Sequence, residues 1–425
     1  FQAAKTMKIS VIGAGYAGLC TAVGFAVKGH NVVCVDIDKK KVDAINSGSS
    51  PIYEKGIETA LRKALGRGLI SASLSADVTS DIFFIAVQTP DTDFSYVRSA
   101  AKNLAKLLKG ATGYKLIVMK STVLPGVTES LVPLLEKSGK KAGKDFGIAV
   151  NPEFLREGSA LEDFLHPDRI VIGEHDRRSG DVLEKIYRNF NAAIIRTNLR
   201  TAEMIKYASN AFLAAKISFI NDIGNYCKTL GIDTYDVAEG IGHDKRIGHA
   251  FLNSGIGFGG SCLPKDANAL VMSAKKHNHN LHVVESIVKL NDTQPLRIVN
   301  LLEKKIKLKD KRIAVLGLAF KSGTDDIRDA PSIKIMKALL RNGATVVAYD
   351  PKAMDRMRKT VHNVHYAKTA RAALNGADAC LLLTEWPEFK RLTDKDFGKM
   401  KNRIIIEGRR ILNKKNVKDF EGVCW

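Results

Sequence analysis

The sequence has 425 residues, of which 45% are hydrophobic and 26% are charged. A chain of this length forms two or three domains, and this composition is typical of globular proteins. Its apolar runs all fall short of the ~20 residues that span a bilayer, so we expect no membrane segment. The formal net charge of +21 is spread along the chain without a nucleic-acid-binding motif, so we expect no nucleic acid as a partner. A polyanionic small substrate or a plain solvated surface accounts for the charge as well.

The first residues and the cysteines bear on the cellular compartment. The first six residues, FQAAKT, lack the apolar core of a secretion signal, and we interpret them as a ragged start before Met7. We therefore expect the protein in the cytoplasm. The cysteines are widely spaced, with no CxxC pair for zinc and no dense disulfide framework, so we expect thiols and no metal. They are Cys20, Cys34, Cys227, Cys262, Cys380 and Cys424.

The first 200 residues alternate strand-like and helix-like segments. Residues 8–36 contain a β-rich run, a glycine turn, a helix of small residues and a second β-rich run that ends at Asp36, which predicts a βαβ unit. Later apolar runs alternate with helical stretches, which predicts a mainly parallel sheet with helices on both faces. These runs lie at 82–87, 115–122, 146–154 and 169–173.

From Thr201 the pattern changes to a long helical stretch that ends before Gly231, a residue typical of helix C-caps. After a glycine-rich loop, a second helical region reaches about residue 305, and the βαβ pattern then resumes with KRIAVLGLAF. The fold class that we predict is α/β, with two Rossmann-like α/β domains joined by a long central helical region. The predicted domains span residues 7–200, 201–305 and 306–425.

The segment GAGYAG, residues 13–18, fits the GxGxxG pattern of dinucleotide-binding turns. Gly13 suits the tight turn, Gly15 the close approach of a pyrophosphate, and Gly18 the packing of helix against strand. The N–H groups at the helix start favour that anion. Asp36 at the end of the next strand suits a ribose hydroxyl and repels a 2′-phosphate, so the sequence predicts NAD rather than NADP. The alternative is a glycine turn without a ligand.

Lys206 and Asn210 lie four residues apart, and therefore on one face of the helix expected from Thr201. The same stripe continues with the apolar Leu213 and Ile217. A polar pair at the end of a buried stripe needs a partner, because an unpaired buried ammonium group is costly. Lining a ligand cleft meets that need. The alternative is a pair of surface residues at a helix end.

Residues 255–276, GIGFGGSCLPKDANALVMSAKK, are the most informative segment. The glycines make a loop that allows a ligand close to the backbone, and Pro264 suits the first turn of the following helix. Cys262 then lies near a helix N-terminus beside Lys265, and both favour a thiolate. Asp266 lies in the same turn. Most single cysteines are small buried hydrophobic residues, but this setting in a chain that binds NAD favours a nucleophile.

Three other polar stretches follow expected strands. KSTVLPG (120–126) and NPEFLREG (151–158) place Thr122 and Glu157 at the carboxyl ends of strands, where ligands meet a doubly wound sheet. In the last domain, GLAFKSGTDDIRDAPS places Lys321 and Arg328 in the loop after the first strand. The alternative for this last stretch is an ordinary charged turn.

Taken in order, GAGYAG, KST, NPEFLREG, Lys206 with Asn210, GFGGSCLPKD and GLAFKSGTDDIRDAPS resemble the UDP-glucose/GDP-mannose dehydrogenase family from about residue 8 to residue 410. Within this family, RIGHAFLNSGIGFGGSCLPKD (246–266) looks most like the branch that oxidises UDP-glucose. The UDP-N-acetylhexosamine branch usually has a histidine where this chain has Ser261.

The resemblance implies a role for each matching position. Cys262 matches the nucleophile, and Lys206, Asn210 and Asp266 match residues that polarise the substrate or position water. Thr122 and Glu157 match polar residues shared between catalysis and the nicotinamide site. Positions that match cofactor contacts are Gly13, Gly15, Tyr16, Ala17, Gly18, Asp36, Lys41, Thr89, Thr122, Glu157, Lys265 and Arg328. Positions that match the sugar-nucleotide site are Glu153, Phe154, Leu155, Arg156, Glu157, Lys206, Asn210, Arg246, Phe251, Leu252, Asn253, Ser254, Gly255, Gly259, Lys321 and Arg409.

The resemblance also implies an assembly. Arg246 matches an arginine that these enzymes contribute across a dimer interface, so we expect a homodimer through the central helices. Two departures concern the site. The usual VGTP is VQTP at 87–90, with a short following segment, and EGRRIL (407–412) offers two adjacent arginines, of which we choose Arg409. The implied domain roles are NAD binding, dimerisation and sugar-nucleotide binding, in chain order.

The expected reaction is the NAD-dependent four-electron oxidation of UDP-glucose at C6 to UDP-glucuronate. Cys262 would hold the aldehyde as a thiohemiacetal, which a second oxidation turns into a thioester that water hydrolyses. The alternatives within the enzymes are a GDP-mannose or UDP-N-acetylhexosamine 6-dehydrogenase, and a two-electron β-hydroxyacid dehydrogenase, which needs no cysteine. Outside the enzymes, a non-catalytic nucleotide-sugar or nucleic-acid binding protein remains as an alternative.

Overall fold

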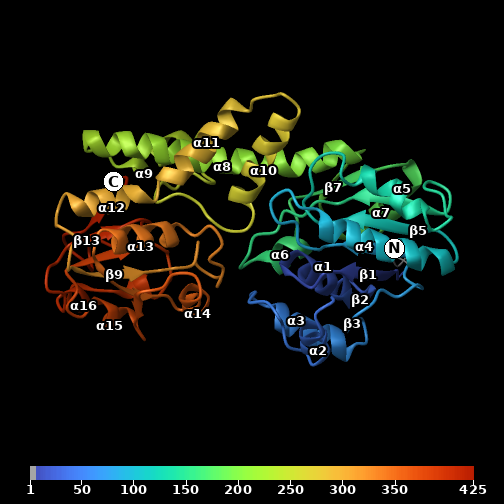
Figure 1. Ribbon diagram of the computed structural model, residues 1–425, viewed down its shortest axis with the longest axis horizontal. Coiled ribbons are helices and arrows are strands. Elements are labelled where there is room, and N and C mark those ends of the chain that lie inside the picture. Colours follow the sequence, from blue (N-terminus) through green and yellow to red (C-terminus); the bar gives the residue numbers. More distant parts are fainter. Residues whose placement is uncertain (1–5) are drawn as a thin grey trace. The chain divides into compact units, whose positions relative to one another are not determined.

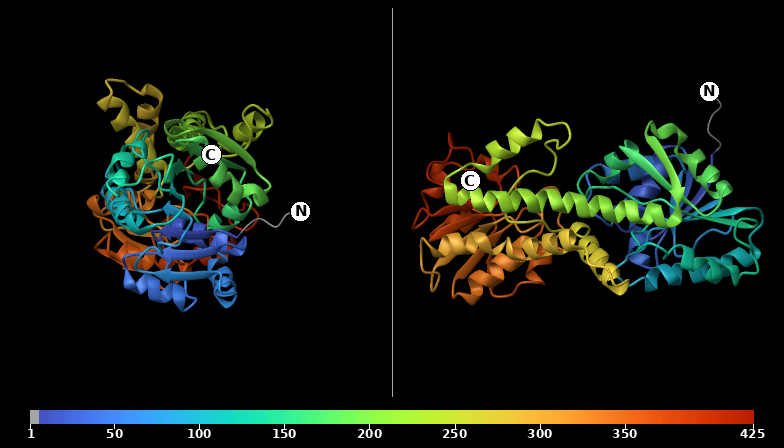
Figure 2. Two further views of the ribbon diagram at one scale, coloured as in Figure 1. Left: turned by 90° about the vertical axis from the view of Figure 1, so that its right-hand side faces the viewer. Right: turned by 90° about the horizontal axis from the view of Figure 1, so that it is seen from above.

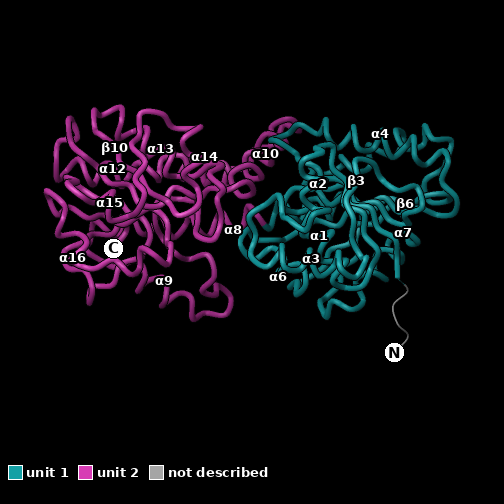
Figure 3. The backbone as a smooth tube through the Cα atoms, turned by 90° about the horizontal axis from the view of Figure 1, so that it is seen from below, with its two compact units in different colours: residues 1–209 teal, residues 210–425 magenta. Residues whose placement is uncertain are grey.

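The computed structural model describes residues 6–425, so the first five residues of the expected ragged start lie outside the described residues. The chain divides into two compact units (Figure 3), the first ending at Ser209 and the second running from Asn210 to Trp425. Each unit contains one β-sheet with helices packed against it (Figure 1). The predicted α/β class, with two mainly parallel sheets and a helical region between them in the sequence, is confirmed.

The first unit begins with the predicted βαβ unit, and strands and helices alternate through it. Its strands are β1 (Lys8–Ile12), β2 (Asn31–Val35), β3 (Ile70–Ser73), β4 (Ile82–Ile85), β5 (Lys115–Met119), β6 (Phe146–Val150), β7 (Arg169–Glu174) and β8 (Ala193–Asn198). Its helices are α1 (Tyr16–Val27), α2 (Lys39–Asn46), α3 (Ile57–Gly66), α4 (Ser95–Gly110), α5 (Val132–Glu136), α6 (Ala160–Leu165) and α7 (Arg177–Tyr187), with short 3-10 helices at Glu129–Leu131 and Arg188–Phe190.

The sheet of the first unit has the order β3-β2-β1-β4-β5-β6-β7-β8. The six strands from β3 to β6 are parallel and follow the doubly wound order of dinucleotide-binding folds, whereas β6 and β7 pair antiparallel. Side chains of β4 alternate between two apolar cores. Ile82 and Phe84 pack in one core, and Phe83 and Ile85 pack in the other. This burial on both faces is why the strand is a continuous apolar run.

The long helix predicted from Thr201 is α8 (Leu199–Leu230), and the right-hand view of Figure 2 shows it as one uninterrupted helix. It begins two residues earlier than expected. The Asn198 side chain accepts a hydrogen bond from the Thr201 N–H at 2.9 Å, which is how a helix N-cap satisfies a free donor. Gly231 follows the helix with φ of +71°, the left-handed conformation that ends many helices.

The helical region that follows the glycine-rich loop and reaches about residue 305 is divided into three helices. Asn278, with φ of +54°, lies in the break between the helix that ends at Lys276 and the helix that begins at His282. Pro295 is the N-cap of the helix that begins at Leu296. The helices between α8 and the second sheet are α9 (Thr234–Gly242), α10 (Leu263–Lys276), α11 (His282–Thr293) and α12 (Leu296–Glu303).

The second sheet repeats the strand order of the first, because β11-β10-β9-β12-β13-β14 is again the order 3-2-1-4-5-6. All of its pairings are parallel. Its strands are β9 (Arg312–Leu316), β10 (Thr345–Tyr349), β11 (Val364–Tyr366), β12 (Ala379–Leu382), β13 (Ile405–Glu407) and β14 (Glu421–Gly422). Its helices are α13 (Pro331–Arg341), α14 (Met354–Arg358), α15 (Ala370–Leu374) and α16 (Asp394–Phe397), with a 3-10 helix at Phe389–Arg391.

Among residues 6–425, no helix combines the length and the apolar character that a membrane crossing requires.

Candidate functional site

The turn between β1 and α1 has the geometry that a pyrophosphate needs. Gly13 has φ of +108°, and a Cβ there would collide with the Ala86 carbonyl, so only glycine fits. A Cβ on Gly18 would collide with the Gly13 carbonyl, because helix and strand pack closely. A Cβ on Gly15, by contrast, would meet no described atom within 4 Å, and Gly15 caps α1 without a side-chain hydrogen bond. The helix start therefore faces open space with N–H groups available to an anion.

Asp36 follows β2 directly and holds this turn in place. Its Oδ2 accepts a hydrogen bond from the Ala14 N–H at 2.8 Å and pairs with Lys41 Nζ at 3.4 Å, and its Oδ1 accepts from the Asp38 N–H. Tyr16 and Ala17 begin α1, with the Tyr16 hydroxyl donating to the Tyr53 carbonyl.

The second unit has the same topology but a different turn. Asp350 follows β10 as Asp36 follows β2, yet Asp350 is fully buried. Its Oδ2 accepts from the backbone N–H groups of Leu318 and Ala319 and from the Trp386 indole, while its Oδ1 accepts from two further backbone N–H groups. The chain's own donors saturate this carboxylate, which leaves no lone pair directed at a ribose. The dinucleotide geometry is therefore specific to the first unit.

A buried ion pair joins the loop after β6 to α8. Lys206 Nζ lies 3.1 Å from Glu153 Oε1, and it also lies over the Phe154 ring at 5.4 Å. Burial raises the pKa of Glu153, but Lys206 and the Leu155 N–H outweigh burial, so the pKa of this carboxyl group lies below its ordinary value. Glu153 is therefore a carboxylate at neutral pH.

Lys120, in the KST motif, was missed as a site residue by the sequence analysis. It is buried, and its Nζ donates to Asn151 Oδ1 at 2.8 Å, the same oxygen that accepts from the Tyr187 hydroxyl. Burial lowers the pKa of Lys120 to about 7, against the opposing effect of Glu153. The available signal was a lysine that directly follows an apolar strand, where a buried ammonium group needs a partner.

The other predicted residues of the first unit lie in loops near the carboxyl ends of strands. Thr122 is half-buried after β5, Thr89 is half-buried after β4, and Glu157 is half-buried in the loop after β6. Leu155 is half-buried there too. Arg156 is exposed and makes a bidentate ion pair with Asp163.

In the second unit, Cys262 is the N-cap of α10 and directly precedes its first turn, which contains Pro264 as expected. It is the one cysteine of the described chain whose side chain is not buried. Burial raises the pKa of Cys34 to about 12 and that of Cys424 to about 11, and it raises the pKa of Cys20 and Cys380 further still. Burial therefore disfavours the thiolate form of these four cysteines.

One turn into α10, Asp266 is fully buried and makes two charge-assisted hydrogen bonds. Its Oδ2 accepts from Asn210 Nδ2 at 2.7 Å, and its Oδ1 pairs with Lys265 Nζ at 2.7 Å. Lys265, which the sequence analysis placed beside Cys262, thus forms its ion pair with Asp266. The Asp266 N–H donates to the Cys262 carbonyl, which fixes this aspartate one turn from the cysteine.

The glycine loop before Cys262 is held by amide side chains that the sequence analysis missed. Asn221 Oδ1 accepts from the Gly255 N–H at 2.7 Å, and Gln294 Nε2 donates to the Gly255 carbonyl at 2.7 Å. Asn291 bonds both backbone groups of Phe258. Asn221 lies three helical turns from Asn210 on α8, so the face periodicity of that helix was a usable signal.

The two predicted arginines Arg409 and Arg328 both contact this loop. Arg409 donates to the Gly257 carbonyl, and a Cβ on Gly255 would lie against Arg409. Arg410 instead pairs with Asp233 at 2.9 Å. The Arg328 carbonyl accepts from the Gly260 N–H at 2.8 Å, and the Arg328 guanidinium pairs with Asp326.

The remaining predicted positions of the second unit lie between the end of α9 and the start of α10, apart from one lysine. Arg246 is exposed and pairs with Asp244 at 2.6 Å. Phe251 has φ of +66°, and Leu252 and Ser254 are buried next to the exposed Asn253. A Cβ on Gly259 would collide with the Asp329 carbonyl. Lys321 lies over the Phe320 ring at 5.7 Å.

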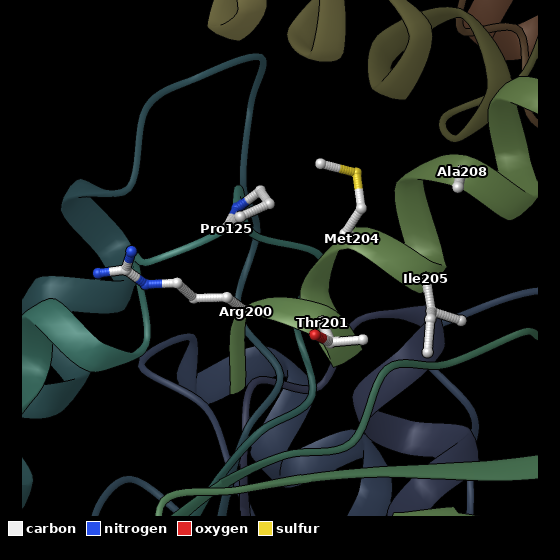
Figure 4. Close-up of a pocket in the computed structure, with 6 residues that line it drawn as sticks. All are labelled: Pro125, Arg200, Thr201, Met204, Ile205 and Ala208. Carbon is white, nitrogen blue, oxygen red and sulfur yellow. The ribbon is translucent and has the colours of Figure 1, made fainter. Parts of the chain in front are cut away.

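A pocket of about 360 Å³ lies at the start of α8 (Figure 4). Figure 4 shows Arg200 extending away from Met204 and Ala208, and its Nε donates to Glu129 at 2.7 Å. None of the residues that line this pocket is a predicted site residue. They are Pro125, Arg200, Thr201, Met204, Ile205 and Ala208.

Three models of one family match the chain in order. Residues 7–191 match the NAD binding domain of the UDP-glucose/GDP-mannose dehydrogenase family, residues 200–293 match its central domain, and residues 314–414 match its UDP binding domain. The chain belongs to the UDP-glucose/GDP-mannose dehydrogenase family. The family resemblance inferred from the sequence motifs is thereby confirmed. The match to its NAD binding domain covers the Gly13 to Gly18 turn, so the predicted cofactor, NAD, is confirmed as well.

Members of this family resemble the chain over nearly their whole length. The UDP-glucose 6-dehydrogenase AglM of Haloferax volcanii is 43% identical, over 98% of this chain and 100% of that protein. A solved UDP-glucose dehydrogenase from Pyrobaculum islandicum is 38% identical with a TM-score of 0.94, over 100% of this chain and 99% of that one. A solved UDP-D-ManNAc dehydrogenase from Pyrococcus horikoshii is 32% identical with a TM-score of 0.87, over 98% of this chain and 99% of that one.

Proposed function

We propose that this protein is an NAD-dependent UDP-glucose 6-dehydrogenase, which oxidises the C6 alcohol of UDP-glucose to the carboxylate of UDP-glucuronate. The observation that carries the proposal is the position of Cys262. It is the one cysteine not buried in the described chain, it caps α10, and it lies one turn from the buried Asp266. A nucleophile with an adjacent polar group is what an oxidation beyond the aldehyde requires.

The residues of the first unit fit the cofactor. Gly15 leaves open space at the start of α1, and the N–H groups there suit a pyrophosphate. Asp36 is positioned after β2 for the adenosine ribose and repels a 2′-phosphate, with Lys41 beside it. Bound NAD supplies the hydride acceptor for each of the two oxidations. Thr89, Thr122, Glu157, Lys265 and Arg328 are the further cofactor contacts that we propose.

Cys262 performs the covalent step. After the first oxidation, its sulfur attacks the C6 aldehyde carbon and a C–S bond forms, while the carbonyl oxygen takes up a proton to give a thiohemiacetal. Loss of a hydride from C6 and of the hydroxyl proton converts this adduct into a thioester. Water then attacks the thioester carbonyl and the C–S bond breaks, which releases the carboxylate and returns the thiol.

Charged and amide side chains stabilise this sequence. We assign Lys206 to the oxyanions that form at C6, because a buried ammonium group stabilises developing negative charge strongly. Asn210 adds a hydrogen-bond donor four residues further along α8. Asp266 or Glu157 accepts the proton of the attacking water. The bond from Asn210 to Asp266 supports this assignment, since it orients both side chains.

The uridine nucleotide is supported over guanosine by the UDP binding domain of the family, which residues 314–414 match. For the sugar, both the 43% identical relative and the 0.94 TM-score structure carry names that specify UDP-glucose. Ser261 precedes Cys262 where the N-acetylhexosamine branch usually has histidine. We propose that Arg409 reaches the substrate, because it lies at the glycine loop, whereas Arg410 pairs with Asp233.

We further propose a homodimer through α8. Phe212, Phe219 and Tyr226 are 67%, 55% and 64% exposed, and they recur every seven residues, so they form one apolar stripe along the helix. Water-exposed aromatic stripes of this kind are typical of protein interfaces. In such a dimer, we propose that the exposed Arg246 of one chain contacts the substrate bound to the other chain.

The domain boundaries that we propose remain residues 7–200 for NAD binding, 201–305 for dimerisation and 306–425 for the sugar nucleotide. We also propose a cytoplasmic location, where NAD and nucleotide sugars are available. A non-catalytic binding protein and a β-hydroxyacid dehydrogenase are not favoured, because neither makes use of a half-exposed Cys262 at a helix start.

A panel of nucleotide sugars tests the substrate. UDP-glucose, UDP-N-acetylmannosamine and GDP-mannose are each supplied with NAD, and absorbance of NADH is followed to completion with the sugar nucleotide limiting. We expect the highest kcat/KM with UDP-glucose and two NADH per molecule. One NADH per molecule would indicate a two-electron dehydrogenase, and absence of NADH with every sugar would support a binding protein instead.

A further inference from the structure

Three potential metal ligands gather at the end of α9, away from the residues assigned to the reaction. Glu239 and His243 are four residues apart and share one face of the helix, and His249 returns to them from the following loop. His243 Nε2 lies 3.2 Å from Glu239 Oε1, and His249 Nδ1 lies 3.5 Å from Glu239 Oε2. All three side chains are exposed, so an ion can reach them from solvent.

The backbone between these residues is shaped to bring His249 back to the helix. Gly242 lies where any Cβ would collide with the His249 imidazole, so glycine allows the ring to pack against the helix end. Gly248 has φ of +66°, and Lys216 Nζ donates to the Ile247 carbonyl at 2.9 Å and to the Gly248 carbonyl at 3.3 Å. The loop is therefore held independently of the three ligands.

We propose that Glu239, His243 and His249 form a binding site for a divalent transition metal, with zinc as the ion that their chemistry fits best. Two imidazoles and one carboxylate are one of the ligand sets found in three-ligand zinc sites, in which water takes the fourth position. In a tetrahedral zinc site, ligand atoms at about 2.1 Å from the metal lie roughly 3.4 Å apart. The separation of 3.2 Å between His243 Nε2 and Glu239 Oε1 is close to this value. His249 Nδ1 lies 3.5 Å from the other carboxylate oxygen, Oε2, and the three ligand atoms all lie within 4.8 Å of one another.

The proposed site departs from the expectation of no metal. That expectation rested on the absence of a CxxC pair and took no account of a Glu-His pair at helical spacing. Bound zinc would tie residues 244–248 to α9, and this segment carries Arg246. A surface ion pair between glutamate and histidine is the competing interpretation of the same contacts. Metal binding distinguishes the two, because an ion pair needs no third ligand.

The test is calorimetric titration of the untagged full-length protein with zinc. We expect one site per chain, with affinity lowered more than about tenfold in Glu239→Gln and in His243→Asn, since even loss of an outer-shell partner costs about 10- to 100-fold. His166→Asn is the matched control, because His166 also pairs with a glutamate four residues before it, and among residues 6–425 this pair belongs to no group of three potential metal ligands. Unchanged zinc affinity in both ligand variants would overturn the proposal.

The thiol of Cys262 could bind zinc in place of the proposed site. The Cys262→Ser variant distinguishes these two binding sites. The site should persist in Cys262→Ser, and cobalt bound there should give visible absorption without the near-ultraviolet band of a thiolate-to-metal transition. Loss of the site in Cys262→Ser, or a thiolate band in the wild type that accounts for all bound cobalt, would assign the metal to the cysteine and contradict the proposal.

Discussion

Asn210 on α8 donates a hydrogen bond to Asp266 on α10, and both side chains are buried. The two residues are 56 positions apart in the sequence, so this bond fixes the turn that follows Cys262 to the long helix. The Asp266 carboxylate depends on Asn210 and Lys265 for its hydrogen bonds, because burial removes it from water.

Replacement of Asn210 by Ala is expected to weaken both folding and turnover. The variant leaves one oxygen of a buried carboxylate without its donor, which costs about 1–3 kcal/mol of the free energy of unfolding. We expect kcat to fall by roughly 10²-fold, because a preorganised donor is lost, with a smaller change in KM. Urea unfolding and steady-state kinetics measure both. Wild-type kcat in the presence of the expected destabilisation would show that the bond is structural only.

The ion pair between Lys206 and Glu153 predicts unequal effects of its two single variants. Lys206→Met leaves the Glu153 carboxylate buried without its cation and should cost about 3–5 kcal/mol of stability. Glu153→Gln keeps the size and one hydrogen-bonding oxygen, so it should cost less. The double variant should regain part of the loss, which a double-mutant cycle measures. Strictly additive losses would refute a direct interaction between the two side chains.

A feature of this structure could be predicted from the sequence when the residues that determine it are close together in the chain. The Gly13 turn, α1 and the end of α8 at Gly231 follow from local rules, because glycine conformation and helix periodicity act within a few residues. The division of the region before residue 305 into three helices had local signals in Asn278 and Pro295, which the expectation did not use.

Partners distant in the sequence were not predictable in the same way. Lys206 and Asn210 were selected for their shared helix face, but the pattern gave no means to choose Glu153 and Asp266 as their partners, 53 and 56 residues away. The saturation of Asp350 by backbone donors was equally hidden, since it depends on how β9 and β10 meet. Contacts of this kind arise only once the helices and strands have packed together.

Lys120 predicts a specific pH dependence of stability. Its pKa is lowered from 10.5 to about 7 in the folded chain, so between these values the unfolded chain holds a proton that the folded chain lacks. The free energy of unfolding should therefore rise from pH 7 toward 10.5, by about 1.4 kcal/mol per pH unit from this group, whereas below pH 7 its penalty is present in full. Lys120→Met should remove this slope. An identical pH profile of the melting temperature in variant and wild type would contradict the assignment.

The proposed dimer predicts that a charge on the α8 stripe separates the chains. Phe219→Glu should convert the dimer into a monomer in light scattering coupled to size-exclusion chromatography, because it places a carboxylate in an apolar interface. Val283→Glu on α11 is the matched control, since Val283 is an apolar residue that is more exposed than Phe219, at 71% against 55%, and lies outside the stripe. A monomeric wild type, or a Phe219→Glu variant that stays dimeric, would argue against α8 as the interface.

The central claim is that Cys262 forms the covalent intermediate between the two oxidations. Its most direct test is formation of UDP-glucuronate from UDP-glucose and NAD by Cys262→Ser, followed by mass spectrometry of both the nucleotide product and the intact protein. We predict that steady production of the uronate is abolished and that any product is an aldehyde or a stalled adduct on the chain. Uronate formation at the wild-type rate would contradict the account.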